Sequence, residues 1–390
     1  MIILKTIIFF STPAQGHINA VYPIIKKMSK KYNIIVFSSK KYKDFILSLN
    51  AKFIEYPINF DDYHLDEITS NFYNLAKNLM CLNKKLYKLL INEIQKINPD
   101  LIIYDSMCSF GKLISYKLNI KSVCFVTTLA FNWYIYFFKG MFIYDIPLFI
   151  KKGGSLLNLI KSERDFRKEF KLPKLNIMDL FINETDKTLV FTPPEFQPLR
   201  ITFPSNFYFI GTTIKDRLKD SAKDINTEKF NVVDIYISLG TIFTEKEFIL
   251  SKFVDMYKNS TSNIVISAGK LFKNYDNYDN IISRKNINQL KILKKSRIFV
   301  NHAGLNSVYE SIYLGTYQVC IPQQNEQLLV AKIIQKKNLG KYLRFKNNKN
   351  FFKKIKYEDY SKNINKYSKI FKKYNATKIA IDIINDYISD

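Results

Sequence analysis

The 390-residue sequence lacks the short motifs by which several large enzyme classes bind cofactors or build their active sites. It contains no GxGxxG, no GxxxxGK, no HExxH and no GxSxG. These absences argue against an NAD enzyme with the usual fingerprint, a P-loop NTPase, a zinc metallopeptidase and an α/β-hydrolase. The DxD triplet is missing as well.

Cysteines and long apolar runs are also scarce. The four cysteines form no CxxC pair, and Cys124 and Cys320 lie in apolar runs that predict burial. Neither disulfides nor a zinc site are indicated, so a reducing cytoplasm is expected. The run from Leu129 to Ile150 is broken by polar residues, and the apolar start Met1–Phe10 carries Lys5. We therefore expect neither a spanning helix nor a signal peptide, and a buried first strand instead.

Positive charge is in excess, and the formal net charge is +26. Between Ala331 and Ala380 there are sixteen lysines or arginines and only two acids. We expect these residues to form a solvated surface that compositional drift has enriched in lysine. The alternative is a surface that makes a weak peripheral contact with a membrane. Nucleic acid is not an expected partner, because no binding motif is present and the aromatic residues lie in apolar runs.

Strand-like and helix-like segments alternate along the chain, which is typical of doubly wound parallel sheets. In the first half we expect strands at Ile2–Phe10, Asn33–Ser38, Lys52–Tyr56, Leu101–Tyr104, Ser122–Thr127, Leu189–Thr192 and Phe207–Ile210, with helices at Gly16–Lys31, Lys41–Leu49, Leu75–Ile97 and Phe110–Lys117. In the second half we expect strands at Asp234–Leu239, Asn263–Ser267, Arg297–Asn301 and Tyr317–Ile321, with helices at Glu245–Lys258, Leu290–Lys294, Asn306–Leu314 and Gln327–Lys337.

This pattern and the chain length predict an α/β protein of two Rossmann-like domains facing a central cleft, where ligands would bind. The N-terminal domain would cover residues 1–213, a polar linker residues 214–230, and the C-terminal domain residues 231–390 with a basic helical tail. The aromatic-rich stretch Phe131–Ile150 departs from the alternation. It fits either a helix core or a lipophilic pocket or membrane-facing flap.

Only three histidines are present, so their positions are informative. His17 follows the first predicted strand, and His302 follows a strand of the second half. Ligands of parallel sheets gather at the carboxyl ends of strands, which makes both histidines candidate site residues. His64 lies in an acidic loop and is expected to be a solvated surface residue.

The segment from His302 to Glu310 reads as a strand end, a tight turn at Gly304 and a helix start near Asn306–Ser307. The free N–H groups of a helix N-terminus suit a diphosphate. An alternative is purely structural, with Ser307 as N-cap and Glu310 as its capping-box partner. After the next strand, the amide and carboxylate side chains of Pro322–Gln327 would suit sugar hydroxyls.

Together these segments resemble the UDP-glycosyltransferase family, that is family 1 with the GT-B fold, and its bacterial macrolide-glycosyltransferase-like branch. The resemblance runs from residue 1 to about residue 345 and rests on the order and spacing of several motifs. These are Gly16-His17-Ile18-Asn19, the strand Pro99–Asp105, Glu195-Phe196-Gln197-Pro198, Ser238-Leu239-Gly240-Thr241, and His302 to Gln327 with Gly304, Asn306, Ser307, Glu310, Gly315, Pro322 and Glu326.

The resemblance implies an inverting, metal-independent transfer of a hexose from a UDP-sugar to a hydroxyl of a small, lipophilic acceptor. Such an acceptor would be a macrolide, a phenolic or a lipid-like molecule. No cofactor is implied beyond the UDP-sugar co-substrate, and the protein would be a monomer or a weak homo-oligomer. His17 would be the general base and Asp105 would orient it. The implied donor-binding residues are Gly240, Thr241, Gln289, His302, Gly304, Asn306 and Ser307 around the diphosphate and base, Glu310 on the ribose, and Glu326 and Gln327 on the sugar.

One loop departs from the family pattern. The family's aromatic-x-Pro-Gln segment aligns with Asn286-Ile287-Asn288-Gln289, which keeps the glutamine but lacks the aromatic residue and the proline. The resemblance therefore leaves the identity of the nucleotide base open. It also leaves two alternatives: a catalytically weak relative that binds a nucleotide sugar, and a basic binding protein of membrane surfaces.

Overall fold

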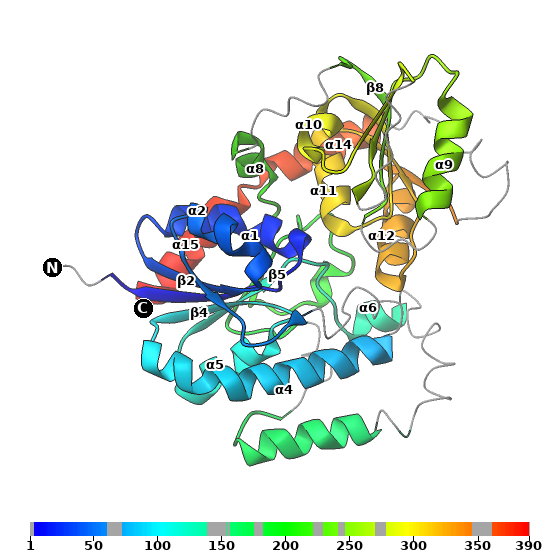
Figure 1. Cartoon of the computed structure of the whole chain (residues 1–390). Helices are drawn as coiled ribbons and strands as arrows, with labels where there is room; N and C mark the ends of the chain where they lie inside the picture. The colour runs from blue at the N-terminus through cyan, green and yellow to red at the C-terminus, as the bar shows by residue number, and fades with distance from the viewer. Residues whose placement is uncertain are drawn as a thin grey trace. The chain divides into compact units, whose positions relative to one another are not determined.

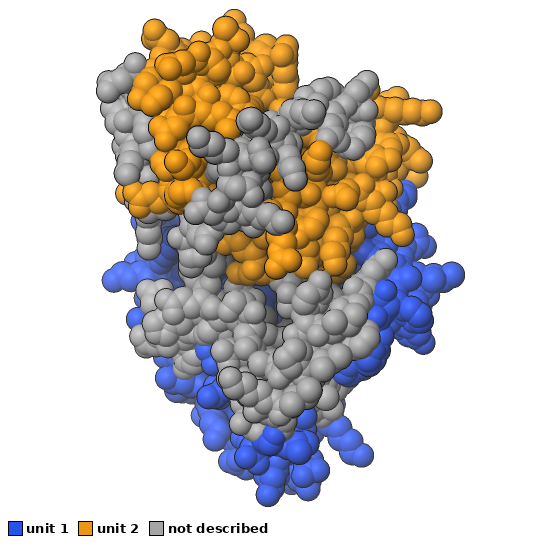
Figure 2. Space-filling view, turned by 90° about the vertical axis from the view of Figure 1, so that its right-hand side faces the viewer, with its two compact units in different colours: residues 1–213, 374–390 blue, residues 214–373 orange. Residues whose placement is uncertain are grey.

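The computed structural model describes residues 4–60, 72–138, 154, 157–174, 182–220, 229–240, 246–269, 278–344 and 361–389 (Figure 1). The chain divides into two compact units, coloured separately in Figure 2. Unit 1 comprises residues 1–213 and 374–390, and unit 2 comprises residues 214–373.

Unit 1 is built on a seven-stranded parallel sheet with the order β3-β2-β1-β4-β5-β6-β7. Its strands are β1 (Thr6–Phe10), β2 (Asn33–Ser38), β3 (Lys52–Glu55), β4 (Leu101–Asp105), β5 (Ser122–Val126), β6 (Lys187–Val190) and β7 (Phe207–Phe209). Its helices are α1 (Gln15–Met28), α2 (Lys43–Ser48), α4 (Phe72–Ile97), α5 (Ser109–Leu118), α6 (Trp133–Phe138) and α15 (Ala376–Ser389), with short 3-10 turns η1 (Lys40–Tyr42) and η4 (Arg200–Thr202). Residues 157–169 are also helical.

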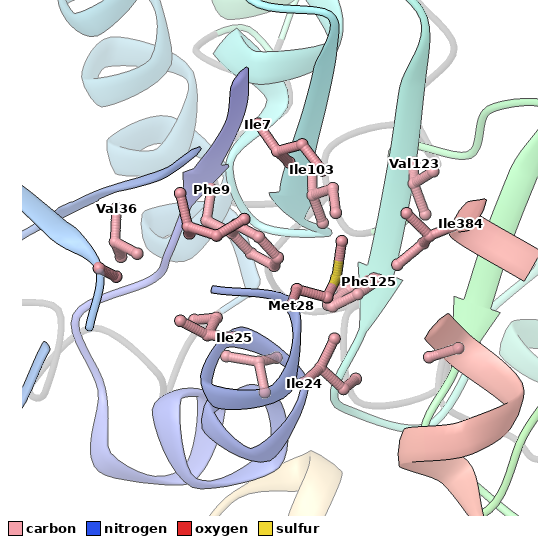
Figure 3. Packing of buried hydrophobic residues seen from close by; sticks show 14 of the residues in the cluster. Ile7, Phe9, Ile24, Ile25, Met28, Val36, Ile103, Val123, Phe125 and Ile384 are labelled. Carbon is pink, nitrogen blue, oxygen red and sulfur yellow. The ribbon is translucent and has the colours of Figure 1, made fainter. Parts of the chain in front are cut away.

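The apolar strands of unit 1 divide their side chains between two cores, because successive residues of a strand point to opposite faces. In β1, Ile7 and Phe9 join the core on the side of α1 and α15, whereas Ile8 and Phe10 join the core on the side of α4 and α5. Figure 3 shows the first core, where Ile24 and Met28 of α1 meet the sheet. Burial on both faces explains why these strands are continuous apolar runs.

Helix α15 corrects the predicted domain boundaries. The second domain was predicted to cover residues 231–390, but α15 packs in the core of unit 1. Its buried apolar residues recur every four positions, at Ala376, Ala380, Ile384 and Ile388, and form one apolar stripe. At the end of the helix, Lys5 Nζ donates to the carbonyl of Ile388 at 2.6 Å. Ammonium groups stabilise the negative end of a helix dipole, so this contact fixes α15 on unit 1.

Unit 2 is built on a six-stranded parallel sheet with the order β10-β9-β8-β11-β12-β13. Its strands are β8 (Val233–Ser238), β9 (Ile264–Ser267), β10 (Ile281–Arg284), β11 (Ser296–Asn301), β12 (Tyr317–Cys320) and β13 (Gly340–Tyr342). Its helices are α8 (Ile214–Asp220), α9 (Lys246–Tyr257), α10 (Gln289–Lys294), α11 (Leu305–Leu314), α12 (Asn325–Lys336) and α14 (Ser361–Lys373).

Two doubly wound parallel sheets confirm the predicted α/β class. Helix α8 occupies the start of the predicted linker 214–230 and belongs to unit 2. Strands β10 and β13 and the helix at residues 157–169 were not predicted. Of the aromatic stretch Phe131–Ile150, helix α6 is described, and its Phe138 side chain is 76% exposed. Residues 139–150 and His64 lie outside the described residues.

The predicted state of the cysteines is confirmed for the two that were singled out, since Cys124 and Cys320 are buried, and all four cysteines are free thiols. Of the helices in the described ranges, none has the length and hydrophobicity that crossing a membrane requires.

Candidate functional site

Each sheet has a point where the strand order reverses, and the predicted site residues follow the strands at these points. In unit 1 the order reverses between the neighbouring strands β1 and β4, and in unit 2 between β8 and β11. His17 follows β1 and Asp105 ends β4, while Gly240 follows β8 and His302 follows β11. Loops that leave such neighbouring strands in opposite directions open a crevice for ligands at the carboxyl edge of the sheet.

The structure brings His17 and Asp105 together, although 88 residues separate them in sequence. His17 is the third residue of α1, and its Nδ1 lies 2.7 Å from Oδ2 of Asp105. The carboxylate is buried and the imidazole is 16% exposed. In a neutral ring that donates from Nδ1 to a carboxylate, Nε2 is the basic nitrogen.

Asp105 is held by further donors at the ends of neighbouring strands. Thr12 Oγ1 donates to Oδ1 at 2.9 Å, and the backbone N–H of Met107 donates to the same oxygen at 3.0 Å. Thr127 Oγ1 donates to Oδ2 at 3.1 Å and also lies 2.8 Å from Nδ1 of His17. Burial by itself raises the pKa of Asp105, but His17, the N–H of Met107 and the Thr12 hydroxyl outweigh it and lower the pKa below its ordinary value. The carboxylate is therefore ionised and oriented.

Sequence reasoning missed Thr12 and Thr127. Both positions carry a signal that could have found them, because each follows the carboxyl end of a strand, as His17 does. The segment Glu195–Pro198 has a structural role in unit 1. Gln197 accepts from the N–H of Ala130 at 3.1 Å and donates to its carbonyl at 2.9 Å, which clamps the loop behind Thr127.

In unit 2 the turn after β11 is shaped by a buried side chain. Asn301 Oδ1 accepts from the N–H of Ala303 at 2.7 Å, and Ala303 takes a left-handed φ of 63°. This conformation is uncommon outside glycine, and the Asn301 contact holds it. His302 is the residue between them, so the turn fixes where its imidazole points.

Two glycines approach the His302 ring closely. Gly240 has a φ of 73°, and a Cβ there would lie 2.8 Å from Cε1 of His302. A Cβ on Gly304 would collide with Nε2 of the same ring. Only glycine leaves room for the imidazole at both positions, so the SLG and HAG segments are packed as one structure around His302. Thr241 lies outside the described residues.

The capping-box alternative for α11 is wrong. The helix begins at Leu305 with Gly304 as its N-cap, and no side chain caps it. Ser307 is therefore the third residue of the helix, where it cannot act as N-cap. A helix N-terminus without a side-chain cap presents backbone N–H groups and the positive end of the dipole, which is the arrangement that binds phosphate groups. Asn306 lies half-buried in the same first turn.

Glu310 belongs to a buried polar network rather than to a cap. Its Oε1 lies 2.7 Å from Nη2 of Arg217, and its Oε2 accepts from Nε2 of Gln289 at 2.6 Å. Gln289 Nε2 also donates to Ser307 Oγ at 3.1 Å, and Tyr236 OH donates to Gln289 Oε1 at 3.2 Å. Gln289, Ser307 and Glu310 were predicted to share a donor site, and the structure brings all three into contact. Arg217 and Tyr236 were missed.

The remaining predicted donor residues lie at the start of α12. Glu326 is exposed, and Gln327 accepts from the N–H of Gln323 at 3.0 Å. In the altered loop, Asn288 is the N-cap of α10, and its side chain accepts from the N–H of Lys291. Asn288, which stands where the family pattern has proline, therefore caps the start of the helix that carries Gln289. Within the described ranges, no cluster of His, Cys, Asp and Glu could hold a metal ion.

Comparison with known proteins finds similarity to glycosyltransferases. The family model described as UDP-glucoronosyl and UDP-glucosyl transferase matches residues 270–377, which include the His302–Glu310 segment. An uncharacterized UDP-glucosyltransferase, YojK of Bacillus subtilis, is 29% identical over 359 residues, covering 87% of this chain and 85% of the relative. The NDP-glycosyltransferase YjiC of Bacillus licheniformis is 26% identical over 351 residues, covering 87% of this chain and 85% of the relative.

Among solved structures, the calicheamicin glycosyltransferase CalG4 superposes with a TM-score of 0.81 at 17% identity, over 100% of this chain and 99% of that chain. This likeness shows the fold, which is GT-B with two parallel-sheet α/β units. The sequence relatives, the family model and the fold agree with one another. The protein is a GT-B glycosyltransferase that is similar to the UDP-glycosyltransferase family, whose model matches residues 270–377.

Proposed function

We propose that the protein is an inverting hexosyltransferase that glycosylates a hydroxyl of a small, lipophilic acceptor, with His17 as general base. The observation that carries this proposal is the 2.7 Å contact between His17 Nδ1 and the buried Asp105 carboxylate. A neutral histidine oriented by an ionised aspartate is a competent base near neutral pH.

In this reaction Nε2 of His17 takes the proton of the acceptor hydroxyl as the oxygen attacks the anomeric carbon of the donor. The bond from that carbon to the β-phosphate oxygen breaks, and its electron pair leaves with UDP. Attack opposite the leaving group inverts the anomeric centre. Asp105 stabilises the imidazolium that forms, because its carboxylate stays ionised at 2.7 Å from Nδ1.

On the donor side, negative charge develops on the diphosphate as the bond breaks. We assign its stabilisation to His302 and to the backbone N–H groups at the start of α11, with Gly304, Asn306 and Ser307 in that first turn. Gly240 would approach the phosphates from the end of β8. Dipoles fixed in place by folding need no reorganisation during the reaction, so we propose that neither a metal ion nor a cofactor is required.

A lipophilic acceptor is proposed from the exposed aromatic residues of unit 1. What supports a lipophilic acceptor is the aromatic surface of α6 in unit 1, where Trp133 stacks with Phe137 and Tyr134 with Phe138. All four side chains are exposed. An exposed aromatic helix is typical of a site that binds apolar molecules. A hexose as the transferred group is supported by the glucosyltransferase name of the YojK relative.

The proposal is tested by incubating the full chain with UDP-glucose and a panel of phenolic and macrolide acceptors. We expect release of UDP with formation of a β-glycoside, identified by the coupling constant of the anomeric proton. Addition of EDTA should leave the rate within about twofold, because charge is balanced by fixed dipoles. An α-linked product would contradict inversion, and loss of activity in EDTA that Mg²⁺ restores would contradict metal independence. Binding of UDP without any transfer would favour a catalytically weak relative.

The cytoplasmic location and the weak membrane contact also stand as proposals. The free thiols support a reducing compartment. Helix α14 exposes lysines at positions 362, 366, 369 and 373, a 4-3-4 spacing that forms one stripe. Lysine stripes adsorb to anionic lipid. We expect the protein to sediment with phosphatidylglycerol vesicles at low salt and not with phosphatidylcholine vesicles. Equal sedimentation with both would reject the contact.

A further inference from the structure

Arg217 is a charged residue inside unit 2 that neither the sequence motifs nor the proposed mechanism uses. It lies on the short helix α8, and its side chain is only 10% exposed. Burial of a guanidinium is costly unless an opposite charge compensates it. Glu310 supplies this charge, since its carboxylate is 3% exposed and lies 2.7 Å from Nη2 of Arg217.

The two oxygens of Glu310 have different partners. Oε1 faces Arg217, and Oε2 accepts from Gln289 at 2.6 Å. A carboxylate offers about four acceptor positions, so about two remain. With one donor fixed on each oxygen, the carboxylate plane is determined, and the remaining lone pairs have a fixed direction.

Glu310 lies six residues beyond the N-cap Gly304, which corresponds to about 9 Å along the axis of α11. A diphosphate at the start of the helix would thus extend its ribose along the helix toward Glu310. The ribose 2′- and 3′-hydroxyls are donors, and the carboxylate is the acceptor that suits them. Without a paired cation, a buried carboxylate this close to a diphosphate would repel the donor.

We propose that Arg217 is a positioning residue of the donor site, which orients the Glu310 carboxylate toward the ribose hydroxyls and compensates its charge. This inference rests on the proposed assignment of Glu310 to the ribose. It gives α8 a role in selecting ribonucleotide over deoxyribonucleotide donors, because an oriented acceptor discriminates against a ligand that lacks the hydroxyl.

The test compares binding of UDP and 2′-deoxyuridine diphosphate to the full chain by calorimetry. Wild-type protein should bind UDP about 10-fold to 100-fold more tightly, the effect of one hydrogen bond to a charged acceptor. In Arg217→Met the affinity for UDP should fall about 10-fold or more, and the preference should fall toward unity. Lys215→Met is the matched control, because it removes an equal charge from an exposed position of α8. It should leave both affinities and their ratio unchanged.

Two further variants separate positioning from folding. The double variant Arg217→Met/Glu310→Gln removes both charges. Its preference for UDP over 2′-deoxyuridine diphosphate should equal that of Glu310→Gln alone. Arg217→Lys keeps the charge but replaces the planar guanidinium by an ammonium group, and it should reduce the preference several-fold even if Arg217→Met fails to fold. Thermal melts of each variant show which of them are folded.

The outcomes are distinguishable. If wild type prefers UDP and the folded Arg217 variants keep the full preference, the inference about Arg217 is wrong and the donor site stands. If wild type binds both nucleotides equally, Glu310 does not read the 2′-hydroxyl, and the inference is again wrong while nucleotide binding stands. If wild type binds neither nucleotide, the proposed function itself fails, and the inference fails with it.

Discussion

Replacement of His17 by alanine is expected to lower the turnover number by about 10²-fold to 10⁴-fold, the contribution of a positioned general base. The affinity for UDP should stay within about twofold, because the expected diphosphate contacts lie in unit 2 and a base acts only on the acceptor proton. The measurement is initial-rate kinetics of UDP-glucose and acceptor, with UDP binding followed separately by calorimetry.

Asp105→Asn should approach the same loss, since an amide in place of the carboxylate neither stabilises an imidazolium nor holds the Nδ1 proton. The matched control is Gln15→Ala, two residues earlier in the first turn of α1, where the exposed side chain donates to Oδ1 of Asn19. This control should retain the wild-type turnover number. If His17→Ala keeps its turnover number within about threefold, the base has been assigned to the wrong residue.

His302→Ala should lower kcat/KM by about 10²-fold to 10³-fold, the cost of removing one donor from a site that stabilises developing negative charge. Here, unlike in His17→Ala, UDP affinity should fall as well, because the proposed partner of the imidazole, the diphosphate, is present in both substrate and product. His302→Gln should recover part of the loss, since the side-chain amide can donate from a similar place.

The comparison is controlled by Lys294→Ala, which removes a positive charge from an exposed position at the end of α10. It should behave as wild type. A different result would contradict the assignment: if His302→Ala binds UDP as tightly as wild type and loses only turnover, the imidazole does not bind the ground-state diphosphate. In that case the N-terminus of α11 would carry phosphate binding alone.

The long apolar strands could be predicted from the sequence because both faces of each sheet are buried. The run Asn33–Ser38 is an example, with residues alternating between two cores and bounds equal to those of β2. Strands β10 and β13 have only four and three residues. In edge strands this short, the alternation of apolar and polar residues is too brief to distinguish a strand from a loop. Helix α15 was predicted as helix, but periodicity identifies an apolar face and not the unit that this face covers.

Positions at the carboxyl ends of long strands could be predicted from the sequence. His17, Gly240 and His302 follow such strands and Asp105 ends one, and the strand order places them at the switch points of the two sheets. The partners of these residues were not visible, because they come from other strands and helices. Thr127 reaches Asp105 from the position after β5, and Arg217 reaches Glu310 from a helix in the predicted linker. Contacts of this kind can be inferred only when the order of the strands in the sheet is known.

The position of α15 has a consequence for synthesis of the chain. Residues 374–390 complete unit 1, yet they leave the ribosome after all of residues 214–373. Domains usually fold in the order in which they emerge. Here unit 2 can close while the first unit still exposes part of its core, around Ile24 and Met28 (Figure 3). The nascent protein thus carries an uncovered apolar surface while residues 214–373 are synthesised, and that surface is where chaperones and proteases would first act on it.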